Sequence, residues 1–255
     1  MANKIDYRNV FQSSAAEYEE ITASKHIRLI YELEKEMLDE LFKETGSTDR
    51  SVMDFACGSG RWTQYLENKF AECIGVDVSK AMVTVAESKC QRAKFIVTDI
   101  TAETVDEQIK DKRFDVITAF RFFKNAEQDL RTSVVAKLPK YLKDDGLFIF
   151  DVHLNTWSFM GLLARIIDRS GLEKILKTGH LTIRTMSLGD VKRLFEDSDL
   201  EIADFWGMGL LPGRSNYTLL PWKWLKKFEG YFTKRKLLRS VSYNLLIVAR
   251  KKKTK

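Results

Sequence analysis

The stretch "SVMDFACGSGRWTQYL", residues 51–66, decides the fold. A short apolar run with an aspartate is followed by two glycines and then by a segment with helical character. A strand, a glycine loop and a helix in that order form the first unit of a doubly wound α/β domain. The dinucleotide fingerprint G-x-G-x-x-G is incomplete, because Gly58 and Gly60 match but Thr63 stands at the third position. Asp54 is a second departure, since a dehydrogenase strand is usually apolar there.

Further apolar runs follow at a regular spacing and predict the rest of the sheet. They cover residues 73–78, 94–100, 114–120 and 146–152, with helix-length segments at 60–69, 79–91, 102–111 and 127–142 between them. This alternation predicts βα units and a mostly parallel, Rossmann-like sheet with helices on both faces. Their nearly unbroken apolar character is typical of strands covered on both sides.

The flanking segments define the expected domain organisation. We expect an N-terminal helical cap at 1–46, from helically spaced apolar residues in 27–42, and an α/β domain at 47–255. Amphipathic helices are predicted at 156–168 and 187–200, the second capped by Ser187. Strands are expected at 201–209 and 242–251, and a mainly helical insertion at about 210–240.

Composition narrows the class of protein. The 255 residues are 44% hydrophobic and 31% charged, with a net charge of +6, which is typical of a globular protein. No apolar run is long enough to span a bilayer and no secretory leader is visible, so a cytoplasmic location is expected. Three cysteines without a CxxC pair favour reduced thiols. The three histidines show no ligand spacing, so no metal is predicted.

Five ordered segments resemble the class I S-adenosylmethionine-dependent methyltransferases. They are "VMDFACGSG", "CIGVDVSKAMVTVA", "FIVTDI", "FDVITAFRFF" and "LPKYLKDDGLFIFDVH". The resemblance implies an enzyme of the Rossmann-like fold with a seven-stranded sheet and an antiparallel last strand. It also implies S-adenosylmethionine as the cofactor.

The residue chemistry of the glycine loop agrees with that cofactor, which carries an ammonium group and no phosphate. An anionic Asp54 suits an ammonium and would repel pyrophosphate. Gly58 and Gly60 allow close approach of the backbone, and Ala56 and Gly58 offer carbonyls. Asp77, at the end of the second strand, can accept hydrogen bonds from both ribose hydroxyls. A helix-capping role is the alternative for Asp77 and for Asp99.

The remaining cofactor contacts are implied by the resemblance. Val78 and Ile100 would sandwich the adenine, and Asp99 would accept from its exocyclic amine. Met82 and Phe120 would line the pocket. Tyr18, in the entry segment "FQSSAAEYEE", would close over the methionine end, or would simply pack against the domain.

The acceptor should lie over the carboxyl ends of the fourth and fifth strands. His153 is the predicted general base, because histidine titrates near neutrality, although a loop residue is the plainer interpretation. Arg121 and Asn125 follow the fourth strand, and Arg121 would suit an anionic or sugar-like acceptor. The [DNS]-P-P-[YFW] motif of adenine and glutamine methylation is absent from this place, as is a Pro-Cys pair.

Residues 219–236 alternate aromatic and basic side chains, which suits a lid over the site or a peripheral membrane contact. The segments "RFFKN" (121–125) and "GMGLLP" (207–212) carry a weaker resemblance to enzymes of bacterial glycan and glycolipid gene sets. That resemblance implies a small-molecule, sugar or lipid-linked acceptor, methylated on oxygen. RNA or protein methylation, a non-catalytic cofactor-binding subunit and an NAD(P) oxidoreductase remain alternatives, although no nucleic-acid-binding module is recognisable. Nothing in the sequence indicates the oligomeric state.

Overall fold

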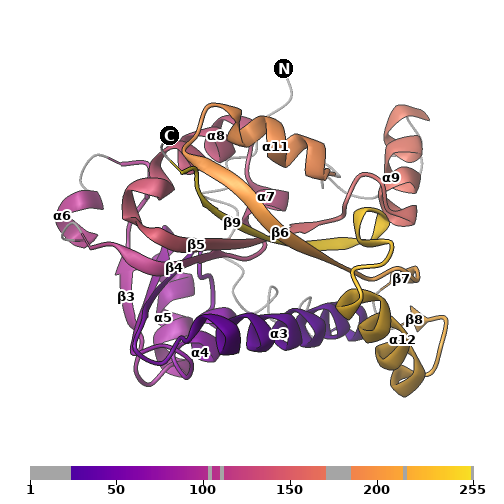
Figure 1. The fold of residues 1–255 in the computed structure, drawn as a ribbon, viewed down its shortest axis with the longest axis horizontal. Coiled ribbons are helices and arrows are strands. Elements are labelled where there is room, and N and C mark those ends of the chain that lie inside the picture. Colours follow the sequence, from indigo (N-terminus) through magenta and orange to yellow (C-terminus); the bar gives the residue numbers. More distant parts are fainter. Residues whose placement is uncertain (1–23, 103–104, 110–111, 171–184, 215–216, 254–255) are drawn as a thin grey trace.

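The centre of the molecule is a seven-stranded sheet (Figure 1). The computed structural model describes residues 24–102, 105–109, 112–170, 185–214 and 217–253. The strand order is β3-β2-β1-β4-β5-β9-β6, and β9 runs antiparallel to both of its neighbours while the others are parallel. The predicted Rossmann-like fold with an antiparallel last strand is therefore confirmed. The strands are β1 (Ser51–Phe55), β2 (Glu72–Asp77), β3 (Lys94–Val97), β4 (Phe114–Ala119), β5 (Leu142–His153), β6 (Leu200–Met208) and β9 (Asn244–Lys251).

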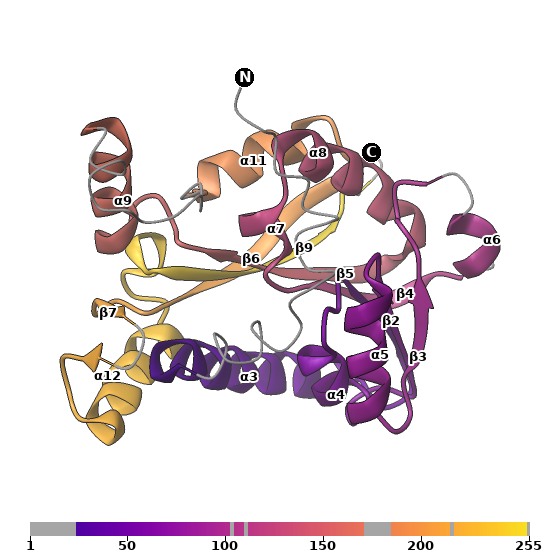
Figure 2. The same ribbon diagram turned by 180° about the vertical axis from the view of Figure 1, so that it is seen from behind.

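Helices cover both faces of this sheet (Figures 1 and 2). One face carries α3 (Lys25–Thr45), α4 (Arg61–Leu66), α5 (Lys80–Lys89) and α12 (Trp222–Lys234). The other carries α7 (Phe122–Asn125), α8 (Gln128–Lys137) and α11 (Leu188–Glu196). The smaller elements are α6 (Val105–Ile109), α9 (Phe159–Ser170), the 3-10 turns η1 (Leu138–Tyr141) and η2 (Arg239–Val241), and the two-stranded hairpin β7 (Gly213–Arg214) and β8 (Tyr217–Thr218).

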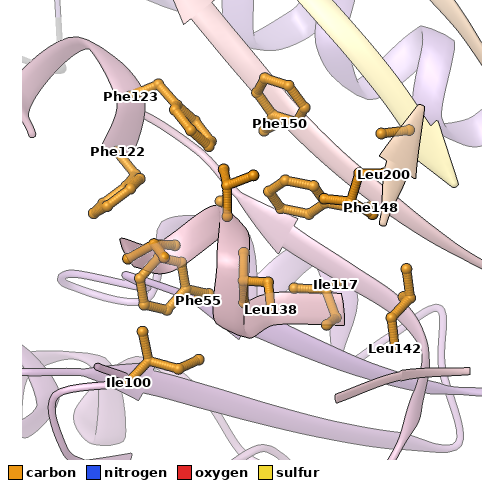
Figure 3. Close-up of a cluster of buried hydrophobic side chains, with 14 of the residues drawn as sticks. Phe55, Ile100, Ile117, Phe122, Phe123, Leu138, Leu142, Phe148, Phe150 and Leu200 are labelled. Carbon is orange, nitrogen blue, oxygen red and sulfur yellow. The ribbon is translucent and has the colours of Figure 1, made fainter. Parts of the chain in front are cut away.

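The core between the sheet and α7, α8 and α11 is built around aromatic rings (Figure 3). The ring of Phe150 lies 4.6 Å from that of Phe123 and 4.8 Å from that of Phe148, measured between centroids. Phe55 and Ile100 belong to the same core and also line a pocket at the carboxyl ends of the strands, described below. The pocket wall is thus part of a close-packed interior, which holds it in shape.

A second core joins the N-terminal helix to the sheet. The buried residues of α3 include Leu29, Leu33, Met37 and Leu38, at the spacing expected for one helix face. They pack in one cluster with sheet residues such as Val52. The helix predicted from residues 27–42 is confirmed, while residues 1–23 of the predicted cap lie outside the described part of the chain.

Element boundaries differ from the predicted ones at places with a local cause. The segment predicted as one helix over 127–142 divides into α8 and η1, because Pro139 lacks a backbone N–H and disfavours helix in the residue before it. Ser187 caps α11 as predicted, within a reciprocal capping box with Asp190. The segment 210–240 holds the β7–β8 hairpin, α12 and η2. Within the described ranges, no helix is both long and apolar enough to cross a bilayer.

Candidate active site

The loop after β1 adopts a conformation that depends on its small residues. Ala56, Gly58 and Gly60 all have positive φ angles, of 54°, 53° and 80°. A Cβ on Gly60 would lie 2.7 Å from the Cβ of Ala86, so a glycine lets α4 begin directly against α5. The loop therefore turns tightly at the carboxyl ends of β1 and β2, with open space beside Gly58.

Asp77 ends β2 and holds this loop in place. Its two carboxylate oxygens accept from the N–H groups of Gly58 and Ser79, each at 2.8 Å. Ser79, not Asp77, caps α5, since its hydroxyl accepts from the N–H of Met82. Burial raises the pKa of Asp77 above its usual value. The carboxylate lines a pocket beside the loop.

That pocket lies at the carboxyl ends of β1, β2 and β4, with α7 and α8 on its other side. It encloses about 760 Å³ of empty space, counted out to its open mouth. Asp99 lines it and accepts from the Thr101 N–H at 2.9 Å and from the Thr101 hydroxyl at 2.6 Å. The predicted site residues that line this pocket are Ala56, Gly58, Asp77, Val78, Met82, Asp99, Ile100, Phe120, Arg121 and Asn125. Leu130 and Val134 of α8 also line it and were not predicted.

A second, smaller pocket, of about 460 Å³, adjoins the first. Four residues line both pockets: Ala56, Gly58, Phe120 and Arg121. The side chains specific to the second include Asp54, Tyr31 of α3 and Trp62 of α4. Trp62 stacks on Phe120 with centroids 3.9 Å apart, and the Arg61 guanidinium lies 4.0 Å from the centroid of the Tyr31 ring. Tyr18 lies outside the described residues, and the tyrosine found at this pocket is Tyr31.

Asp54 is buried at the base of the second pocket with two hydroxyl partners. It is 1% exposed and accepts from the Thr63 hydroxyl at 2.6 Å and from the Thr118 hydroxyl at 2.8 Å. Burial raises its pKa to about 6, although these two hydrogen bonds act in the opposite direction. Thr63, which replaces the third glycine of the dinucleotide fingerprint, therefore orients the acid that distinguishes this loop.

Arg121 stands where the two pockets meet and is the centre of a buried polar network. It has a positive φ of 62° and precedes α7. Its N–H donates to one oxygen of Asp151 at 2.5 Å, and Nη1 donates to the other at 2.7 Å. Nη2 lies 3.6 Å from Oε2 of Glu34, which is fully buried on α3. Burial raises the pKa of Glu34 to about 7, against the opposing effect of Arg121.

His153 and Asn244 complete the network. His153 Nδ1 lies 2.5 Å from Arg121 Nη1, and Nε2 lies 3.1 Å from the Tyr243 hydroxyl. Nδ1 also lies 3.1 Å from the Asn244 Oδ1, so both a donor and an acceptor face this nitrogen. Burial, reinforced by Arg121, holds the pKa of His153 well below its usual value. The Asn244 amide donates to Glu34 Oε1 at 2.8 Å.

The third predicted catalytic residue, Asn125, supports the turn before α7. Its amide donates to the Arg121 carbonyl at 2.8 Å. No sequence pattern predicted a site role for Glu34, Asp151, Tyr243 or Asn244. Asp151 carried a signal, because an acid within the apolar run "GLFIFDV" needs a partner. Glu34 lies among charged residues at ordinary helix spacing, so no sequence signal pointed to its site role.

A glycine loop after β1, an acid at the end of β2 and this strand order define the nucleotide-binding core of a class I methyltransferase. The sequence model of the methyltransferase domain matches residues 52–146. A ubiquinone biosynthesis O-methyltransferase of Methylococcus capsulatus is 26% identical over 171 residues, which cover 66% of this chain and 70% of that protein. The (S)-coclaurine N-methyltransferase of Papaver somniferum is 24% identical over 94% of this chain and 65% of its own length.

The fold is similar to that of a solved methyltransferase over the whole length of that chain. Magnesium protoporphyrin IX methyltransferase from Synechocystis, with bound SAH (S-adenosylhomocysteine), has a TM-score of 0.63 at 15% identity and covers 97% of this chain and 100% of its own. This chain belongs to the class I S-adenosylmethionine-dependent methyltransferases. Its cofactor is S-adenosylmethionine.

Proposed function

We propose that the enzyme methylates a hydroxyl oxygen of a small-molecule, sugar or lipid-linked acceptor. The observation that carries this proposal is Arg121, a partly buried cation at the junction of the two pockets, fixed by Asp151 and Glu34. A fixed guanidinium recognises hydroxyl or anionic groups by directional hydrogen bonds. The O-methyltransferase among the similar proteins supports oxygen as the methylated atom.

The two pockets fit the two ends of the cofactor. In the larger of the two we assign Asp77 to the ribose hydroxyls, and Val78, Ile100 and Met82 to the adenine. Asp99 is assigned to the adenine amine. The Asp77 carboxylate lines this space and retains acceptor capacity beyond its two backbone bonds.

The smaller pocket suits the amino-acid end. Its base is the Asp54 carboxylate, which would hold the ammonium group, and Ala56 and Gly58 border it. A cation beside Asp54 would offset the burial that raises its pKa. Tyr18, which lies outside the described residues, is still proposed to cover this end of the cofactor. Tyr31 lines the smaller pocket and is proposed to share that role.

The reaction requires an aligned acceptor and a destination for its proton. When bound, S-adenosylmethionine supplies a methyl group on a sulfonium, which an acceptor oxygen takes by in-line displacement. Arg121, at the pocket junction, and Asn125, in the larger pocket, would orient the acceptor. His153 stays the proposed proton acceptor. Its lowered pKa keeps it neutral at pH 7, so it takes a proton only from a hydroxyl made strongly acidic by bonding to the methyl carbon.

A lipid-linked acceptor would bring the enzyme to a membrane surface. The inner side of α12 packs on its own domain through Leu225, as a lid would. Its outer side leaves Trp224 and Tyr231 exposed by 65% and 50%. These exposed aromatic rings support our proposal of a peripheral membrane contact through residues 219–236.

The test is methyl transfer from radiolabelled S-adenosylmethionine to a panel of acceptors. The panel holds free sugars, a lipid-linked sugar, a phenol, an amine, RNA and a protein extract. We expect label in an oxygen ether of one hydroxylated acceptor, and Arg121→Lys should lower kcat about a hundredfold with SAH affinity retained. Label in the amine, RNA or protein alone would refute the oxygen acceptor.

Cofactor binding is tested separately by calorimetry with SAH. Asp77→Ala should weaken binding about tenfold to a hundredfold, because a bidentate charged contact is lost. Asp49→Ala is the matched control, since Asp49 lies in an exposed turn outside both pockets. Equal affinity of the two variants would remove Asp77 from the cofactor site.

A further inference from the structure

Helix α9 leaves four of its large apolar side chains exposed. Phe159 and Ile166 are each 63% exposed, and Leu162 and Leu163 are 42% and 40% exposed. Among the described side chains of this helix, the buried positions are two small residues, Gly161 and Ala164. This arrangement is the reverse of a helix that packs on its own domain, where the large apolar side chains face inward.

The root of α9, which is the N-terminal end of the helix with the residues just before it (155–161), holds the helix in this orientation. A Cβ on Gly161 would lie 2.0 Å from the carbonyl oxygen of Asn155, so the helix backbone lies directly on that residue. The Asn155 amide is itself anchored, donating to the carbonyls of Ser240 at 2.8 Å and Ser242 at 2.9 Å. The Ser158 hydroxyl accepts from the Gly161 N–H at 3.0 Å. The exposure of the apolar face therefore follows from a fixed junction.

Helix α12 lies at the same end of the molecule as α9 (Figures 1 and 2). There Trp224 and Tyr231 are exposed, together with the exposed cations Lys223 and Lys227. In the described part of the chain these two lysines have no acidic partner, whereas Lys226 of the same helix pairs with Glu32 and Glu36 of α3. Trp157, at the root of α9, is 56% exposed and has the Arg165 guanidinium 5.7 Å from its ring centroid.

We propose that α9 and the outer side of α12 form one membrane-facing surface, which binds the enzyme to an anionic bilayer. The apolar side chains of α9 would enter the headgroup and acyl boundary, and Lys223 and Lys227 would face anionic headgroups. Basic residues beside exposed apolar and aromatic side chains are complementary to such a surface and to no purely apolar partner. The surface flanks the end of the sheet at which β5 and β6 finish.

This inference rests on the proposed function and narrows it, since it makes the acceptor an amphiphile that resides in the bilayer. If α9 faces the membrane, the apolar part of an acceptor would stay in the lipid while its polar group reaches Arg121. A water-soluble sugar would gain nothing from this surface. The enzyme should therefore act on the bilayer-embedded form of its acceptor.

The test is co-sedimentation of the full chain with vesicles of phosphatidylcholine alone or mixed with phosphatidylglycerol. We expect binding to the mixed vesicles that weakens as salt is raised. Leu162→Ser with Ile166→Ser should weaken it about tenfold or more, because inserted apolar surface is lost. Ile166→Leu should bind as the parent does, as should Val97→Ser, an exposed apolar residue on β3. Lys223→Glu with Lys227→Glu should abolish the preference for anionic lipid.

The outcomes separate this inference from the proposed function. Equal vesicle binding by the parent and the serine variant would overturn the membrane-facing surface, as would a parent chain that ignores both vesicle types. A parent chain that dimerises, and whose serine variant is monomeric, would assign α9 to a second copy and overturn it too. SAH affinity measured on the same samples reports on the cofactor site, and the serine variant should retain it.

Discussion

Asp54 joins burial, two hydroxyl partners and a raised pKa at the base of the smaller pocket. If it holds the cofactor ammonium, its ionised form must be the binding form, because a neutral carboxyl does not attract a cation. Its pKa of about 6 then sets a pH dependence. SAH affinity should be constant above that value and fall as the pH drops below about 6, when Asp54 becomes protonated. Calorimetry on either side of that pH measures this directly.

The variant Asp54→Asn isolates the contribution of this one carboxyl. It should bind SAH at least about tenfold more weakly at about pH 8, and it should lose affinity less steeply than the parent on acidification. The remaining slope would come from Asp77, whose pKa burial also raises. Asp49→Asn serves as the control. A variant that keeps the parental slope would show that Asp54 does not hold the ammonium.

Residues of the two pockets could be predicted because they lie at strand ends within continuous segments. Asp54, Asp77 and Asp99 each follow an apolar run, so their common edge follows from parallel pairing of the strands. The Arg121 network could not be predicted in the same way. Glu34 and Asn244 come from a helix and a strand 210 positions apart, and only the packed fold brings them together.

At the scale of the elements, α12 is anchored by Glu229, a buried acid whose carboxylate accepts hydrogen bonds from backbone N–H groups. Glu229 accepts from the N–H groups of Gly209, Leu210 and Leu211 at 3.0, 3.0 and 2.9 Å. Glu229→Ala should lower the free energy of unfolding by about 2–4 kcal/mol, because it leaves one buried and two partly buried backbone donors without their acceptor. Denaturant unfolding measures this, and hydrogen exchange should quicken at residues 209–211.

The control for this change is Glu36→Ala on α3. Glu36 also faces α12, but it does so as a partly exposed partner of Lys226, 3.3 Å away. Its loss should cost under about 1 kcal/mol, because a solvated ion pair contributes little. Equal losses of stability in the two variants would contradict the anchoring role of Glu229.

Gly161 of α9 and Gly189 of α11 are helical glycines that form a matched pair for testing the junction of α9. Gly161→Ala places a Cβ 2.0 Å from the Asn155 carbonyl oxygen, whereas a Cβ at Gly189 would come no closer than 3.5 Å to the Ser187 hydroxyl. We expect Gly161→Ala to destabilise the protein by about 2 kcal/mol or more. Gly189→Ala should be neutral or stabilise it by up to about 1 kcal/mol. Thermal unfolding of both variants decides this, and equal melting temperatures would contradict the close contact.

Helices and strands of the α/β core could be placed from periodicity because both faces of the sheet are covered. The segment after β5 could not, since the amphipathic pattern of 156–168 predicts a helix but does not say which side it buries. Gly161 lies against Asn155, and together with Ala164 it forms the buried side of α9, which reverses the usual orientation of the helix. Likewise, the aromatic and basic pattern of 219–236 has an inner side fixed on α3 and β6 and an outer side left exposed.

Across the whole molecule, Glu34 ties the N-terminal helix to both halves of the sheet. It accepts from Asn244 of β9 and faces Arg121, which follows β4. Its pKa is raised to about 7, mainly by burial, whereas an unfolded chain releases this proton near the ordinary value of a glutamate. The stability that the proton confers is therefore complete below the unfolded pKa and is lost as the pH rises through about 7.

The variant Glu34→Gln should be free of that loss, because its amide stays neutral and can still accept from Asn244. The free energy of unfolding of the variant, relative to the parent, should therefore rise by on the order of 2 kcal/mol between about pH 5 and about pH 8. Urea unfolding at several pH values measures it. Glu201→Gln, which removes an exposed partner of Arg250 on the sheet, should follow the parent at every pH. If Glu34→Gln follows the parent too, Glu34 is ionised in the folded protein throughout this range, and the Arg121 network carries two charged carboxylates rather than one.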